Sequence, residues 1–304
     1  QPPVYLFLID VTVTSVNSGL LDVVCNTIKK LLPKNNDPNA TPDAAAANSA
    51  VGAGSNKRTM FDSRTLIGII TFDSTLHFYN LNANLKQTQM LVVSDIQDMF
   101  IPLAEDVLVN VYESQNVINN LLDNLPNMWR NNKVTDCCAG NALKIAFSVL
   151  KKVGGKLLFF LSSVPNIGEL TVNVKREKKE KSSSYKSIYS SNTSSSNTGG
   201  GMGSKNNALD IKAREIEMLT PFNNAYSELA QTVSQYQIAV DLFACPLYGI
   251  DLASIYPLVK NTGGSLYYYP QFNVHQYSDR LREELLFALT TETAWESVMK
   301  IRIS

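Results

Sequence analysis

The sequence lacks an excess of charge of either sign, and it lacks any long hydrophobic run. Its 304 residues include 27 basic and 27 acidic side chains, so the formal net charge is zero. A neutral chain has no global electrostatic attraction for nucleic acid or for an anionic membrane. No apolar run reaches the roughly 18 residues that a membrane-spanning helix needs. We therefore expect neither a nucleic-acid partner nor a transmembrane segment.

Cysteine is scarce, and its spacing excludes a zinc finger within this chain. The four residues are Cys25, Cys137, Cys138 and Cys245, and none forms the C-x-x-C pair of a structural zinc site. We expect buried free thiols, which are typical of a reducing compartment. The first ten residues, QPPVYLFLID, lack the basic region and cleavage site of a signal peptide. Because a strand pattern begins at residue 4, we expect the chain to be part of a longer protein.

Two segments have almost no large apolar side chains. Residues 34–57 are rich in Asn, Ala, Pro and Gly, and residues 171–207 consist mainly of Lys, Glu, Ser, Asn and Gly. Such segments cannot bury enough apolar area to offset the entropy lost on ordering. We predict that both are disordered insertions in a single domain that covers residues 1–304.

The rest of the chain alternates apolar strand-length runs with helical spacing. We expect strands at residues 4–9, 65–72, 76–81, 90–94, 156–162, 237–245, 265–270 and 295–304. We expect helices at residues 16–31, 108–125, 143–150, 208–233, 250–261 and 276–289. Strands that are apolar on both faces and are followed by helices predict a doubly wound α/β fold. Its sheet is mostly parallel, has helices on both faces, and gains one antiparallel edge strand from a hairpin at Asp73–Ser74.

The first strand leads into residues DVTVT, which resemble part of the metal site of von Willebrand A-type domains. Asp10, Thr12 and Thr14 match the D-x-[ST]-x-[ST] pattern of that family. The family's other two ligands, a Thr and an Asp, are replaced here by Ala139 and Ser163. Mg²⁺ needs about six oxygen ligands, usually with one or two carboxylates. We therefore predict a degenerate site without metal, in which the three remaining side chains hydrogen-bond the loop and cap the next helix.

Catalytic motifs are missing as well. No G-x-S-x-G sequence is present, and neither His77 nor His275 lies beside a Ser or Cys. We expect His77 to be a half-exposed strand residue. The glycine-rich stretch at 52–57 falls inside the first insertion, away from the strand and helix that a phosphate loop requires. The sequence leaves open whether Asp10 and Asp73 form a carboxylate pair for acid–base catalysis. We nevertheless predict a binding protein and no enzyme.

Longer stretches of the sequence resemble one family. The chain is similar to the trunk domain of the cargo-adaptor subunit of the COPII inner coat, the Sec-twenty-four family. The resemblance extends over nearly the whole length, in PPVYLFLIDV, IGIITFDSTLHFYNL, MLVVSDIQDMFIPLAEDVLVN, AGNALKIAF, GGKLLFFLSSVPNIG, VDLFACPLYGIDLASI, TGGSLYYYPQFN and TAWESVMKIR.

The resemblance implies a non-enzymatic role on the cytoplasmic side of the endoplasmic reticulum. Such adaptors pair with the Sec-twenty-three subunit, are recruited to the membrane by the Sar-one GTPase, and select cargo by its sorting signals. The resemblance places a zinc finger upstream of the trunk, so no cofactor is expected in this chain. It also implies that residues 293–304 begin a following β-sandwich module. Residues that contact partners cannot be assigned from these motifs. The alternative is a metal-dependent A-type ligand-binding domain, which Ala139 and Ser163 disfavour.

Overall fold

The computed structural model describes residues 2–33, 61–103, 106–172, 216, 218–291, 293 and 298–303. The first predicted insertion, at residues 34–57, lies outside the described residues. So does the second, apart from residues 171 and 172. No helix in these described ranges is both long and apolar enough to cross a membrane.

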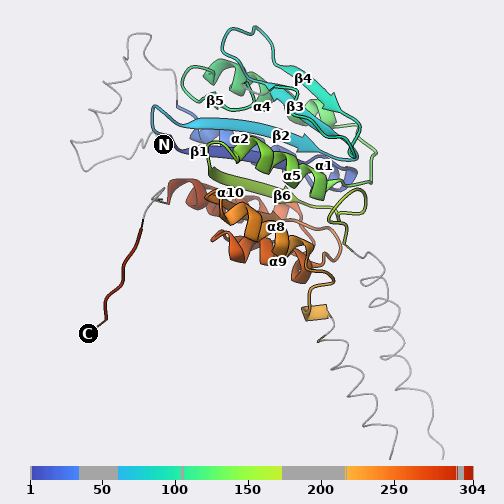
Figure 1. Ribbon diagram of the computed structural model, residues 1–304. Coiled ribbons are helices and arrows are strands. Elements are labelled where there is room, and N and C mark those ends of the chain that lie inside the picture. Colours follow the sequence, from blue (N-terminus) through green and yellow to red (C-terminus); the bar gives the residue numbers. More distant parts are fainter. Residues whose placement is uncertain are drawn as a thin grey trace, which may run out of the picture.

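A single sheet forms the centre of the described structure, with eight strands in the order β4-β3-β2-β1-β6-β7-β8 and β5 paired to β2. The strands are β1 (Val4–Asp10), β2 (Leu66–Phe72), β3 (Leu76–Asn80), β4 (Gln89–Val93), β5 (Val109–Asn110), β6 (Gly155–Leu161), β7 (Ile238–Ala244) and β8 (Leu266–Tyr268). The pairs β1–β2, β1–β6, β6–β7 and β7–β8 are parallel. In Figure 1 the blue β1 lies between β2 and the yellow-green β6. The predicted doubly wound sheet is confirmed.

The antiparallel edge begins at the predicted hairpin. β3 pairs antiparallel with β2, and β4 then pairs antiparallel with β3. The short β5 adds to β2 on the same half of the sheet, also antiparallel. The antiparallel edge therefore contains two full strands, and β4 is the outermost (Figure 1).

Helices cover both faces of the sheet, as the apolar strands require. The helices are α1 (Val13–Ser18), α2 (Leu20–Leu31), α4 (Gln115–Trp129), α5 (Ala139–Leu150), α8 (Ala225–Ser234), α9 (Leu252–Asn261) and α10 (Val274–Thr290). One core cluster contains buried residues of α2, α4 and α10, and the other contains those of α5, α8 and α9. The two clusters share no residue, because successive strand side chains point to opposite faces.

Three predicted elements, besides the first helix, differ from the structure. The helix expected at 108–125 begins only at Gln115, because the Asn110 side chain accepts hydrogen bonds from the backbone of Tyr112 and Glu113 and forms a turn there. The helix expected at 208–233 is interrupted near Pro221: the described residues Ile216, Met218 and Leu219 are helical, and α8 begins at Ala225. Residues 298–303, expected in a strand, pair with no strand in the described ranges, and a strand needs a neighbour for its hydrogen bonds.

The helix expected at residues 16–31 is divided in two at Gly19. This glycine has a φ of 75°, a left-handed conformation that ends α1 and redirects the chain into α2. A Cβ atom at this position would collide with the side chain of Val274 at the start of α10. Gly19 therefore allows both the change of direction and the close approach of α10.

Candidate functional site

The carboxyl edge of the parallel strands collects the residues that the sequence singled out. Asp10 is the last residue of β1, and Ser162 and Ser163 follow β6 directly. Ala139 is the first residue of α5, and Asp73 follows β2. All five are buried. In doubly wound folds ligands bind outside this edge, so its contacts decide what the domain can do there.

Asp10 is completely buried, and both of its carboxylate oxygens accept hydrogen bonds from neighbouring loops. Its Oδ1 accepts a hydrogen bond from the backbone N–H of Thr12 at 2.8 Å. Its Oδ2 accepts three, from the backbone N–H and hydroxyl of Ser162 at 2.9 and 2.7 Å and from the N–H of Ser163 at 2.8 Å. Four donors around one carboxylate satisfy its charge without a cation. Asp10 thus joins the end of β1 to the loop after β6.

The neighbouring residues do not fit a magnesium ion. The hydroxyls of Thr12 and Ser163 hydrogen-bond each other at 2.6 Å, and Ala139 presents only a buried methyl group. The N–H groups of Ser162 and Ser163 both donate to Oδ2 of Asp10. No group of three or more His, Cys, Asp and Glu residues in the described ranges is arranged to hold a metal. The geometry favours a structural role for Asp10, in which its carboxylate holds the two loops together, and the loss of metal binding stays a prediction.

The predicted helix-capping role is wrong for the hydroxyls of this segment. Thr12 occupies the N-cap of α1, but its side chain makes no capping hydrogen bond, because its hydroxyl is directed to Ser163. Thr14 lies within α1 and is half-buried. The loop is held mainly by the carboxylate of Asp10, as predicted for that residue.

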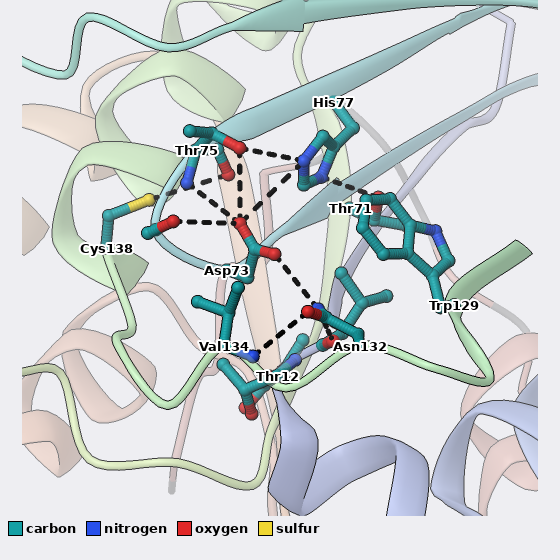
Figure 2. A network of polar contacts seen from close by, with 12 residues as sticks. Thr12, Thr71, Asp73, Thr75, His77, Trp129, Asn132, Val134 and Cys138 are labelled. Atoms are coloured by element: carbon teal, nitrogen blue, oxygen red, sulfur yellow. Dashed lines mark hydrogen bonds and ion pairs between the residues drawn. The ribbon is translucent and has the colours of Figure 1, made fainter.

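Asp73 organises a second buried network, shown in Figure 2. Its Oδ1 accepts hydrogen bonds from the backbone N–H and the hydroxyl of Thr75, at 2.9 and 3.2 Å. Its Oδ2 accepts one from the side-chain amide of Asn132 at 3.0 Å, and the same amide donates to the carbonyl of Val11 at 2.7 Å. The network ties the hairpin to the loop after α4 and to the end of β1. Asp10 and Asp73 therefore hold separate sets of donors, and no hydrogen bond joins them in the described ranges.

His77 lies in this network and is buried, so the prediction of a half-exposed residue is wrong. β4 covers the outer side of β3, and the ring of Trp129 packs on the imidazole with 4.4 Å between ring centroids. Its two ring nitrogens contact the hydroxyls of Thr71 at 3.2 Å and Thr75 at 2.9 Å (Figure 2). Burial lowers the pKa of His77, although the carboxylate of Asp73 opposes that shift. The imidazole is therefore neutral at physiological pH.

We expect this buried histidine to make the fold less stable in mild acid. In the unfolded chain His77 binds a proton near its usual pKa of about 6.5, whereas in the native state its pKa is lower. The unfolded state then binds more protons, so stability falls as pH drops below about 6.5, by up to about 1.4 kcal/mol per pH unit. Urea unfolding at pH 7.5 and pH 5.5 measures the loss.

The matched pair for this test is His77→Gln and His275→Gln, since these are the two histidines of the chain and His275 is exposed. The first variant is expected to lose most of the pH dependence between these two conditions, and the second to keep it. Equal pH dependence in wild type and His77→Gln would contradict the assignment.

The buried thiols offer no nucleophile. All four cysteines are free and buried, as predicted. Burial raises the pKa of Cys138 to about 12 and raises that of Cys137 well above its usual range. A thiolate is the reactive form of cysteine, so these side chains are chemically inert at neutral pH.

Comparisons with known proteins agree with this arrangement. The family model described as the Sec23/Sec24 trunk domain matches residues 1–289. The chain is 38% identical over 302 residues to "Protein transport protein SEC24 A" of Arabidopsis thaliana, covering 99% of the chain and 24% of that protein. It is 34% identical over 305 residues to human "Protein transport protein Sec24B", covering 99% of the chain and 20% of that protein.

A solved structure, that of the human COPII-coat protein Sec24c, matches with a TM-score of 0.70 and 28% identity. The match covers 95% of this chain and 32% of that one. The chain thus spans about a quarter of the curated relatives it matches. The chain belongs to the Sec23/Sec24 trunk domain family, with Sec24 proteins among its relatives along its whole length.

Proposed function

We propose that this chain is the trunk domain of a COPII cargo adaptor, which acts by binding and not by catalysis. The observation that carries the proposal is that the polar groups at the strand ends form hydrogen bonds within the chain itself. Asp10 accepts four hydrogen bonds from its own chain, and Asp73 is bound by Thr75 and Asn132. In this fold the same edge holds ligands or catalytic groups in other proteins. Here it stabilises the sheet, which leaves the outer surface for function.

The proposed setting is the cytoplasmic face of the endoplasmic reticulum and of COPII vesicles, in transport toward the Golgi. The domain pairs with a Sec23 subunit, contacts the membrane peripherally as part of that pair, and supports cargo selection by the longer protein. Membership of the Sec23/Sec24 trunk domain family supports the pairing, and the Sec24 relatives support the adaptor role. Residues 293–304 are proposed to lead into the β-sandwich module that the resemblance implies.

Co-elution with a purified, folded Sec23 subunit tests the pairing. A stable contact between the two trunks buries at least about 1,000 Å² in total. We expect a 1:1 complex on size-exclusion chromatography when each protein is present at about 10 μM, which corresponds to a Kd in the micromolar range or below. A von Willebrand A-type domain of another family serves as the control and is expected to elute separately. Separate elution of this chain and Sec23, with both shown to be folded by circular dichroism, would overturn the pairing.

A further inference from the structure

The outermost strand of the sheet has a free edge without the usual protection. β4 pairs with β3 on one side, and no strand in the described ranges lies on its other side. Natural proteins usually protect such edges with charged residues, proline or bulges. The sequence of β4, QMLVV, contains neither a charge nor a proline. Met90 and Val92 are 40% and 51% exposed, so the strand also presents apolar side chains to solvent next to this edge.

A cavity of about 680 Å³ lies beside this edge, between β4 and α4. Met90 lines it from β4, and Asn124, Asn127 and Met128 line it from α4. Buried Tyr79, which is the register partner of Met90 on β3, also lines it. Since side chains alternate along a strand, Val92 lies on the same face of β4 as Met90. The cavity lies at the amino end of β4, so a strand added to β4 would direct the side chain that lies beside Met90 toward it.

We propose that the free edge of β4 binds an extended peptide segment of a partner protein, which adds to the sheet as an antiparallel strand. Its backbone would pair with the unpaired N–H and C=O groups of β4, its apolar side chain beside Met90 would enter the cavity, and the next one on that face would cover Val92. Methionines adapt to varied side chains, and the asparagine amides provide donors and acceptors for a polar backbone. The volume lies within the range of ordinary ligand sites.

Charge around β4 selects the orientation and the sequence of this peptide. Lys86 lines the cavity at the amino end of β4, whereas Asp95 and Asp98 are exposed just after its carboxyl end. An antiparallel peptide places its own carboxyl end near Lys86 and its amino end near the two aspartates. The favoured segment therefore has a basic residue first, alternating apolar residues in the middle, and an acidic residue last.

Fluorescence anisotropy with a synthetic peptide tests the proposal. The probe alternates valine and threonine between an amino-terminal arginine and a carboxyl-terminal glutamate, with both termini blocked and a fluorophore attached. We expect a Kd in the micromolar range for the wild-type chain. The same peptide with its arginine and glutamate exchanged is expected to bind at least about threefold more weakly, because its charges then face like charges.

Two surface variants locate the site. Val92→Lys places a charge on the exposed face of β4, next to the free edge. It is expected to weaken peptide binding at least tenfold. Phe287→Lys changes a side chain on α10 that is 64% exposed and does not line the cavity, and it is expected to change binding by less than twofold. Circular dichroism and the melting temperature confirm that both variants are folded.

Three results would overturn the proposal. One is the absence of binding to the wild-type chain at peptide concentrations up to about 1 mM. Another is equal weakening by the two variants. The third is a wild-type chain that elutes as a dimer and becomes monomeric on Val92→Lys, which would show that the edge pairs with a second copy. The inference does not depend on the coat role, because a failed Sec23 pairing with intact peptide binding would leave the strand site in place.

Discussion

Replacement of Asp10 by alanine is expected to destabilise the domain by about 3–5 kcal/mol. The side chain is fully buried and accepts hydrogen bonds from the backbone of Thr12, Ser162 and Ser163 and from the hydroxyl of Ser162. Alanine would leave three backbone N–H groups buried without an acceptor, and each such group costs about 1–3 kcal/mol. The free energy of unfolding in urea, followed by tryptophan fluorescence, measures the loss.

Two further variants test whether the loss of stability comes from the hydrogen bonds of Asp10 or only from the removal of a negative charge. Asp22→Ala removes an exposed carboxylate from the first turn of α2 and is expected to cost less than about 1 kcal/mol. Ser162→Ala removes one of the four donors but leaves the backbone donors paired, so its cost should be intermediate, about 1–2 kcal/mol. A loss for Asp10→Ala no larger than that for Asp22→Ala would show that Asp10 does not hold the two loops together.

Breaking the buried ion pair of Lys156 and Asp241 is expected to cost about 3–5 kcal/mol. These residues belong to the neighbouring parallel strands β6 and β7, and the ammonium and carboxylate lie 2.6 Å apart. Lys156 also donates to the carbonyl of Ala288 at 2.9 Å, and Asp241 accepts from the backbone N–H of Ser265 at 2.8 Å. The side chains are 13% and 2% exposed, so removal of either partner leaves a charge that water reaches poorly.

A double-mutant cycle tests this pair. Lys156→Met and Asp241→Leu should each be strongly destabilising, whereas the double variant should recover a large part of the loss, because a well-packed apolar pair can replace a buried ion pair at little cost. Lys29→Met, which breaks an exposed pair with Asp123, is the control and should cost less than about 1 kcal/mol. Single variants that lose no more stability than the double variant would contradict the coupling.

The Asp10 network was predicted in part, whereas the ion pair between β6 and β7 was not predicted. Asp10 stood out because DVTVT follows an apolar strand, and the substitutions at Ala139 and Ser163 indicated that the metal site was lost. The sequence did not show that the N–H groups of Ser162 and Ser163 hydrogen-bond the carboxylate of Asp10, because that contact joins residues about 150 positions apart. The ion pair of β6 and β7 was missed, although one lysine and one aspartate in otherwise apolar strands were a readable signal.

Local periodicity by itself determined the parallel strands, most of the helices and the fold class, because strand and helix spacing depend on near neighbours. The family was indicated by the resemblance of stretches spread along the chain. Only the tertiary structure decided that His77 is buried, since its cover comes from β4 and from Trp129 on α4. It likewise decided that β4 has a free edge beside a cavity. Burial and strand order depend on which distant segments meet, and no local pattern encodes that choice.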